Sequence, residues 1–330
     1  MAKQKESSPP QQCVFITNQN GIQTSPPPPS NNTDSTRARS RRNRVYIYRD
    51  FILSTYPQLT SSSNILDVAG GRGDLSWLLR NIDGINSTIA DPRLPKHNSL
   101  IKSTEFLLSH PEEAMVRAVE GRPTHQPLAA LLPRLIYNCI DADGQFCLSS
   151  PSHLRMYVDD KLVQTVKRVF REEYSEEEKM RIWDEYWYLQ RRRMEPNNNT
   201  KVVPLIDDDQ NHPPQHADVT APKQQITNSR EAYETIRSLD YIAGFHPDQA
   251  TEPAIDLAIF LKIPWSVVPC CVFPKEFPNR QLNGGRVKNH SQLIEYLCKK
   301  HAKIRRGVLP FVDTVTAKNV VLYMLSEDYD

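Results

Sequence analysis

The sequence predicts an α/β protein, and three observations lead to this fold class. The first is a short apolar strand at residues 64–68, followed by a glycine-rich turn and a helix beginning near Leu75. The second is another short apolar run, residues 87–91, which also ends in an acid. The third is the alternation of strands and helices from residue 239 onward. Such alternation is typical of a sheet covered by helices.

Residues 1–42, ahead of the first strand, are predicted to be a disordered tail. Their Ser, Pro, Gln and Asn content cannot bury enough apolar surface to offset the entropy lost on ordering. The tail ends in an arginine cluster that could bind RNA phosphates, act as a nuclear signal or simply solvate the segment. Residues 45–59 then carry apolar side chains at helical spacing, which predicts a helix beside the first strand.

The turn after the first strand predicts a ligand site. Glycines are needed where the backbone turns sharply and approaches a ligand, because a Cβ would clash there. The helix that follows would point free N–H groups at the bound molecule. A dinucleotide fingerprint would require glycine or alanine at Ser76, so it is not met. The acid and the small residues of the turn are Asp67, Ala69, Gly70, Gly71 and Gly73.

An acid, Asp91, also ends the second strand. In nucleotide-binding α/β folds an acid at this position accepts hydrogen bonds from ribose hydroxyls. Aspartate also starts turns without any ligand, and this alternative stays open for Asp67 and Asp91. The order strand, acid, glycines, helix, strand, acid favours a nucleotide-like ligand.

The same order resembles the first motif of class I S-adenosylmethionine (SAM)-dependent methyltransferases. In that motif an acid and three glycines alternate with variable residues, and Ala69 stands here for the first glycine. The resemblance implies a Rossmann-like sheet, mostly parallel with an antiparallel last strand, and SAM as the cofactor. It further implies that Asp91 binds the SAM ribose and that Asp67 lies near the methionine ammonium.

Residues 135–140 form a continuous apolar run and are predicted to be the third strand. Asp141 follows, and the methyltransferase resemblance implies that it lies near the adenine; Asp143 is a competing choice. Residues 43–150 would then be the SAM-binding half of the methyltransferase domain.

Residues 151–235 are predicted to be an insertion, made of charged helices and then a flexible linker. Its aromatic residues Trp183, Tyr186, Trp187 and Tyr188 precede three arginines, 191–193. Aromatics can stack bases and arginines can meet phosphates, as in proteins that bind single-stranded nucleic acid. The alternative is an amphipathic helix that buries its aromatics and leaves its arginines in water.

Residues 236–330 are predicted to be the C-terminal half of the methyltransferase domain. The expected strands and helices alternate in chain order. They are a strand at 239–244, a helix at 254–261, a strand at 265–271, a helix at 292–301 and strands at 304–309 and 319–325. The last helix and two strands fit the final hairpin of the methyltransferase sheet.

The loop after the strand at 239–244 holds two candidate catalytic residues, His246 and Asp248. Ligands in open α/β sheets bind outside the carboxyl ends of the strands. A hydroxyl nucleophile gains from a base, and either residue could take that role. Alternatively, the imidazole bonds a backbone carbonyl and Asp248 caps the next helix.

This loop and the pair Cys270–Cys271 resemble one branch of the class I methyltransferases. That branch has a Gly-Leu-His-x-Cys-Gly-type loop and a strand ending in Cys-Cys, and it includes tRNA 2′-O-methyltransferases. The resemblance implies an RNA substrate; a protein or small-molecule acceptor and a non-catalytic scaffold stay open as alternatives. Adjacent residues on an extended chain point to opposite sides. The cysteine pair therefore predicts a structural role and no metal site.

Composition is consistent with an intracellular protein, cytoplasmic or nuclear. The 330 residues carry a net charge of +2, so charge gives no global footprint for nucleic acid. The six cysteines lack CxxC spacing, and no apolar leader opens the chain, as expected for a reducing compartment. No run approaches the ~20 apolar residues of a membrane span, so no membrane partner is predicted.

Overall fold

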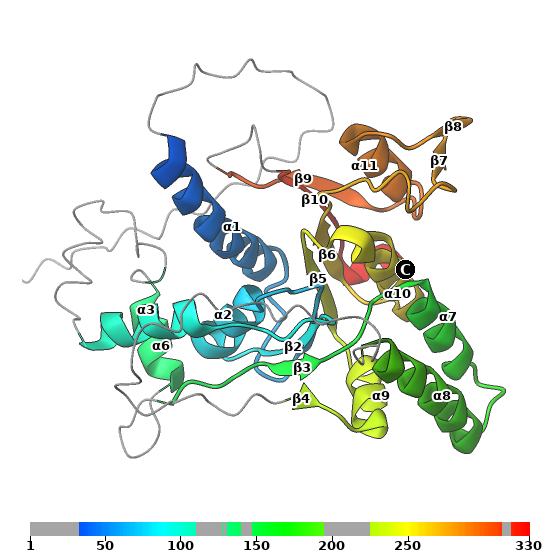
Figure 1. Ribbon diagram of the computed structural model, residues 1–330, viewed down its shortest axis with the longest axis horizontal. Helices are drawn as coiled ribbons and strands as arrows, with labels where there is room; N and C mark the ends of the chain where they lie inside the picture. Colours follow the sequence, from blue (N-terminus) through cyan, green and yellow to red (C-terminus); the bar gives the residue numbers. More distant parts are fainter. Residues whose placement is uncertain (1–32, 110–127, 129–130, 140–146, 195–224, 312–317) are drawn as a thin grey trace, which may run out of the picture.

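The computed structural model describes residues 33–109, 128, 131–139, 147–194, 225–311 and 318–330. Its main feature is a central eight-stranded sheet with helices on both faces (Figure 1). The strands of this sheet are β1 (Asn64–Val68), β2 (Asn86–Ala90), β3 (Ser152–Leu154), β4 (Gln225–Ile226), β5 (Tyr241–Phe245), β6 (Trp265–Val268), β9 (Arg305–Val308) and β10 (Val320–Met324). A separate hairpin pairs two short strands, β7 (Gln281–Leu282) and β8 (Gly285–Arg286).

The α-helices of the described residues lie between these strands in the chain, except that the first precedes β1. They are α1 (Thr33–Thr55), α2 (Asp74–Asp83), α3 (Asn98–Ser109), α6 (Leu132–Cys139), α7 (Asp160–Val169), α8 (Glu176–Met194), α9 (Ser229–Arg237), α10 (Thr251–Leu261) and α11 (His290–Cys298). Two short 3-10 turns, η1 (Asp248–Ala250) and η2 (Ser326–Tyr329), complete the set. Helix α1 begins within the segment predicted to be a disordered tail, and residues 1–32 of that tail lie outside the described residues.

Local sequence sets several helix ends. Asp159, Asn228 and Asn289 stand just before α7, α9 and α11, and each side chain accepts a hydrogen bond from a backbone N–H of the first turn. Such caps satisfy donors that the helix itself leaves unpaired. Gly84 ends α2 with a φ of 68°, a left-handed conformation that suits glycine.

The sheet has the strand order β4-β3-β2-β1-β5-β6-β10-β9. All pairs from β4 to β6 are parallel, whereas β10 runs antiparallel to both of its neighbours. The prediction of an α/β protein with a mostly parallel sheet and an antiparallel last strand is confirmed. The order reverses at β1, because β2 lies on one side of it and β5 on the other. Open α/β sheets bind ligands outside the carboxyl ends of the strands at such a reversal.

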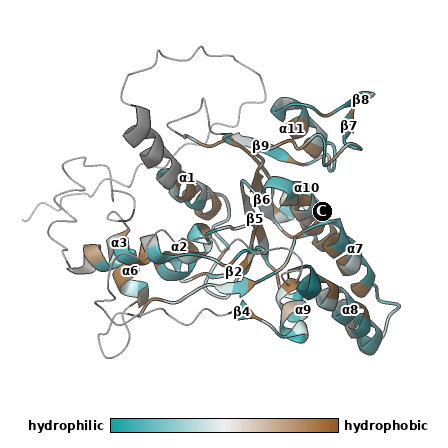
Figure 2. Ribbon diagram, viewed as in Figure 1, coloured by the Kyte–Doolittle hydropathy of each residue, from teal (hydrophilic) through white to brown (hydrophobic). Residues whose placement is uncertain are grey.

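Alternate residues of the central strands face two hydrophobic cores, because successive side chains of a strand point to opposite faces. Leu66 and Ile242 belong to the core covered by α7, α8, α9, α10 and α11. Ile65 and Tyr241 belong to the core covered by α1, α2 and α6. Figure 2 shows hydrophobic residues on the central strands and hydrophilic ones along the outer parts of α7 and α8. Because helices cover both faces of the sheet, the central strands have nearly continuous apolar sequences.

The prediction of a strand at residues 135–140 is wrong, since residues 132–139 form helix α6. Leu135 and Cys139 are buried four residues apart, while Ile136 and Tyr137 between them are exposed. This is helical spacing, and a short apolar run does not distinguish a buried strand from a helix. The third strand along the chain is instead β3.

The segment 151–235 contributes to the sheet as well as to the helices. Its strands β3 and β4 extend the parallel sheet beyond β2, and its helices α7, α8 and α9 cover one face. The predicted charged helices are present as α7 and α8. Most of the predicted linker, residues 195–224, lies outside the described residues.

A network of ionic contacts around Glu252 ties α10 to α11. The carboxylate accepts hydrogen bonds from Arg280 Nε at 2.6 Å and from the Tyr296 hydroxyl at 2.6 Å, and Lys300 Nζ lies 2.7 Å away. Burial opposes ionisation of Glu252, but bonds from Lys300, Tyr296 and Arg280 outweigh burial and lower its pKa. The network therefore favours the ionised carboxylate.

Glu252→Gln is expected to lower the free energy of unfolding at pH 7 by about 3 kcal/mol, because it leaves the buried Arg280 guanidinium without its carboxylate partner. A carboxylate with a lowered pKa contributes stability that is lost as pH falls through its folded pKa. The difference between wild type and variant should therefore shrink below about pH 4. Urea denaturation of wild type and variant, at pH 7 and below about pH 4, measures this difference in stability. Glu177→Gln, on the exposed side of α8, is the control; equal effects of the two changes would contradict the role of the network.

Candidate functional site

The glycine-rich turn, residues 69–73, joins β1 to α2 at the carboxyl edge of the sheet. Its backbone is held against the neighbouring strand, because Ala69 N–H donates to the carbonyl of Ala90 at 2.8 Å. Ala69 itself has a φ of 51°. A left-handed backbone is uncommon for a residue with a Cβ, so Ala69 is strained where glycine would not be.

Asp67 lies beneath this turn and is fully buried. Its Oδ2 accepts a hydrogen bond from the Ser76 hydroxyl at 2.9 Å. Its Oδ1 has no hydrogen-bond partner among the described residues. A Cβ on Gly70 would lie 2.6 Å from Asp67 Oδ2, so only glycine fits there. Burial raises the pKa of Asp67 to about 7.

Asp91, at the end of β2, is also buried, but its carboxylate is fully engaged. Oδ1 accepts from the backbone N–H of Arg93 at 2.8 Å and from its Nε at 3.0 Å. Oδ2 accepts from Gly71 N–H at 2.9 Å and from Arg93 Nη2 at 3.0 Å. Burial opposes ionisation of Asp91, but these bonds outweigh burial and lower its pKa. The Arg93 side chain is 72% exposed.

Two cavities are lined in part by residues of the turn. The smaller, about 350 Å³, is lined by Asp67, Gly70 and Phe245 among others. The larger, about 610 Å³, is lined by Ala69 and Asp91 among others. Ala69 and Gly70 are consecutive residues, so both cavities border the turn at the point where the strand order reverses.

The loop after β5 supplies the two predicted catalytic residues, and both line the larger cavity. His246 Nε2 lies 2.9 Å from the carbonyl oxygen of Lys318, which agrees with the alternative of a backbone contact. The start of α10 has no side-chain cap, so Asp248 does not cap that helix. His246 and Asp248 have φ values of 54° and 48°. Strained backbone of this kind clusters at functional sites.

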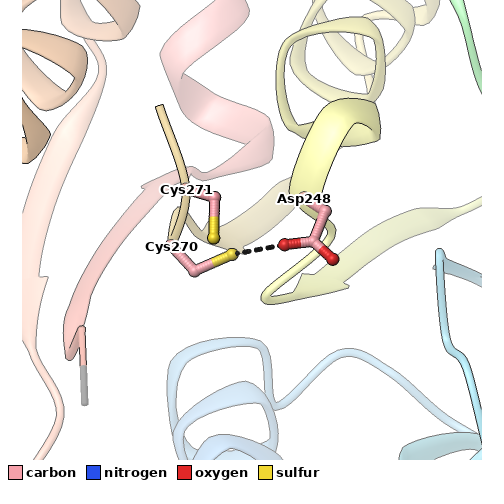
Figure 3. A group of neighbouring side chains, drawn as sticks. All are labelled: Asp248, Cys270 and Cys271. Carbon is pink, nitrogen blue, oxygen red and sulfur yellow. Dashed lines mark hydrogen bonds between the residues drawn. The ribbon is translucent and has the colours of Figure 1, made fainter. Parts of the chain in front are cut away.

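The structure places Cys270 and Cys271 beside Asp248 (Figure 3). Cys270 Sγ donates a hydrogen bond to Asp248 Oδ1 at 3.1 Å. The expectation that the two side chains point to opposite sides is wrong, because β6 ends at Val268 and the cysteines follow in irregular backbone. The alternation argument applies only within a strand.

The aromatic residues of α8 mostly pack inside. Trp183, Tyr186 and Trp187 are buried, so the interpretation of α8 as an amphipathic helix is confirmed for them. Tyr188 is exposed. At the end of α8, the Arg193 guanidinium lies 4.3 Å from the centre of the Tyr157 ring. Both of these residues line the larger cavity.

Sequence reasoning missed Arg93, Tyr157 and Arg193 as cavity residues. Arg93 could have been found from the sequence, because it follows the predicted site residue Asp91 by two residues. Tyr157 follows β3, a strand that the sequence did not predict. The predicted adenine contact Asp141, and its competitor Asp143, lie outside the described residues.

Comparison of the chain with protein families, curated proteins and solved structures finds no match in any of the three. Among the described helices, none combines the length and apolar character needed to cross a lipid bilayer.

Proposed function

We propose that this chain is a SAM-dependent methyltransferase with a Rossmann-like sheet. The observation that carries the proposal is the buried Asp67 carboxylate: Asp67 lines the smaller cavity, and its Oδ1 has no hydrogen-bond partner within the described residues. A buried carboxylate with one unpaired oxygen is costly, and a cation relieves that cost. The methionine ammonium of SAM has the required charge.

The ribose of the same ligand is proposed to bind Asp91. The carboxyl end of β2 is where α/β nucleotide sites hold a ribose. Arg93 fills the acceptor positions of Asp91, so the guanidinium must leave before a ribose diol binds. The exposed Arg93 side chain makes that exchange feasible. The turn between the two acids would carry the backbone contacts to the ligand.

When bound, SAM would supply an electrophilic methyl group to an acceptor in the larger cavity. The chain's own contribution is to orient that acceptor, since positioning supplies much of the acceleration in such transfers. Burial lowers the pKa of His246, which favours the neutral imidazole, the form that can accept a proton. His246 and Asp248 are the candidate bases for a hydroxyl acceptor.

RNA is the proposed acceptor class. On the wall of the larger cavity the Arg193 guanidinium lies over the Tyr157 ring and also pairs with Asp159 at 2.6 Å. Proteins that bind single-stranded nucleic acid use aromatic and arginine side chains to stack bases and to meet phosphates. The Tyr157–Arg193 pair supports the RNA substrate that the branch resemblance implies, more directly than the buried aromatics of α8 do.

Calorimetric titration of the full chain with SAM and, separately, with NAD tests the cofactor. Saturable binding of SAM but not of NAD is the expected result, and the reverse preference would overturn the proposal. Transfer of a labelled methyl group from SAM to total RNA, a protein extract or a small-molecule pool then tests the acceptor. Label in protein or small molecules alone would replace RNA by those classes.

A non-catalytic scaffold is the second candidate function. It is favoured by the contact of His246 Nε2 with the Lys318 carbonyl, which occupies one side of the candidate base. A scaffold would bind SAM in the titration and transfer no methyl group to any acceptor pool.

A further inference from the structure

Three potential metal ligands converge at the carboxyl ends of two neighbouring strands. Asp248 follows β5, and Cys270 and Cys271 follow β6, which pairs with β5 in parallel. The Asp248 carboxylate oxygen and the two sulfur atoms all lie within 4.8 Å of one another. Figure 3 shows the three side chains directed toward a common point.

The surrounding backbone holds this convergence in place. The Thr251 hydroxyl donates to the carbonyl of Asp248 at 2.7 Å, and His290 Nε2 lies 2.9 Å from the carbonyl oxygen of Pro269. The N–H of His246 donates to Val268 at 3.2 Å, which joins the two loops. Asp248 keeps a left-handed φ, a cost that persists only where the surroundings over-determine the conformation. The cluster is therefore built by both loops.

The spacing of the ligand atoms suits a tetrahedral ion. With bond lengths of ~2.0–2.3 Å, ligand atoms in a tetrahedral zinc site lie ~3.3–3.8 Å apart. The 3.1 Å separation of Cys270 Sγ from Asp248 Oδ1 is close to that range, and the Cys271 sulfur lies within 4.8 Å of both atoms. Cys271 and Asp248 are exposed, so an ion could enter from solvent.

We propose that Asp248, Cys270 and Cys271 bind one zinc ion. Two sulfur ligands select a soft or borderline cation over Mg²⁺ or Ca²⁺, which prefer oxygen. Zinc binding would displace the two thiol protons to solvent. Three protein ligands would leave one tetrahedral position to water or to an atom of the acceptor, the arrangement of catalytic rather than structural zinc.

The position of the cluster suggests its use. Asp248 lines the larger cavity, so the ion would lie at the wall where the acceptor is proposed to bind. If Asp248 binds zinc, its carboxylate is no longer available as a base. Of the two candidate bases, His246 then remains. Zinc binding itself does not depend on SAM, so the two proposals fail independently.

The test is the zinc content of the full chain, purified under reducing conditions, loaded with zinc and dialysed. The expected result is about one zinc ion per chain by elemental analysis. Cys270→Ser and Cys271→Ser should each lose the bound zinc. Cys298→Ser is the matched control, because this half-buried thiol lies at the end of α11 and contacts Arg306. Absence of zinc in wild type, or its retention in both cluster variants, would overturn the proposal.

Cobalt loading of the wild-type chain provides a readout that needs no variant to fold. Thiolate-to-cobalt charge-transfer absorption in the near ultraviolet is expected, because both sulfurs would ligate the ion. Asp248→Asn should keep that absorption but change the visible bands, since an oxygen ligand is weakened while the thiolates stay. A cobalt spectrum without the thiolate band would overturn the proposal.

Discussion

Asp67→Asn is expected to weaken SAM binding by about 100-fold, because it removes a charge-assisted hydrogen bond to the ammonium. The same change should stabilise the ligand-free protein at pH 7. The folded state raises the pKa of Asp67 from 3.8 to about 7. Between these values the folded protein keeps a proton that the unfolded chain has lost, so stability falls as pH rises through this window. Asparagine cannot ionise and escapes that penalty of about 2–4 kcal/mol.

Urea denaturation across this pH range and SAM titration measure the two effects separately. Wild-type affinity for SAM should increase as pH rises through 7, because only the ionised carboxylate pairs with an ammonium. Asp240→Asn is the control, since this exposed aspartate bonds Asn64 N–H at the other end of the same strands. Unchanged SAM affinity in Asp67→Asn would remove Asp67 from the cofactor site. Unchanged stability would show that Asp67 is ionised in the folded protein.

These opposed effects explain why a buried, partly unsatisfied carboxylate would be kept. Ser76 satisfies one oxygen of Asp67, and Gly70 is small enough to leave the carboxylate room. A fully satisfied carboxylate would make the ligand-free protein more stable but would offer nothing to an incoming cation. Under the proposed function, Asp67 would lower the stability of the ligand-free protein and raise its affinity for a cation.

The parts of the fold that were predictable from sequence are those determined by neighbours in the chain. Strands β1, β2, β5 and β6, helices α10 and α11 and strands β9 and β10 all lie where apolar runs and turn residues indicate them. Strands β3 and β4 are only three and two residues long and have no apolar run of their own. Their stability comes from pairing with β2 and with each other, which no local pattern reveals.

Some residues of the candidate site could likewise be predicted from the sequence, and others could not. Asp67, Asp91, His246 and Asp248 were identified because each lies at or just after the carboxyl end of a recognisable strand, and parallel strands bring these ends to one edge. The approach of Cys270 and Cys271 to Asp248 was missed, because it depends on where β6 ends rather than on composition. The Tyr157–Arg193 pair was missed because it joins the unpredicted end of β3 to the end of α8.

Asp91→Ala is expected to reduce SAM affinity by about 100-fold or more, since two ribose hydroxyls lose a charged acceptor. Arg93→Ala is expected to have the opposite effect. In the ligand-free protein Arg93 bonds both carboxylate oxygens, so a ribose must first displace the guanidinium. Removing the guanidinium removes that competition and should tighten SAM binding several-fold, by about 1 kcal/mol. Calorimetric titration of both variants measures the two shifts.

The double variant Asp91→Ala/Arg93→Ala separates competition from direct contact. If Arg93 acts only by filling Asp91, its removal has no effect once Asp91 is gone, and the double variant binds SAM as weakly as Asp91→Ala. If Arg93 itself holds the ligand, Arg93→Ala weakens binding in both backgrounds, and the competition model fails. Full affinity in Asp91→Ala would instead exclude Asp91 as the ribose acceptor. Because Gly71 N–H also loses its partner in Asp91→Ala, Asp91→Asn, which retains one acceptor oxygen, distinguishes a disturbed turn from a lost ribose contact.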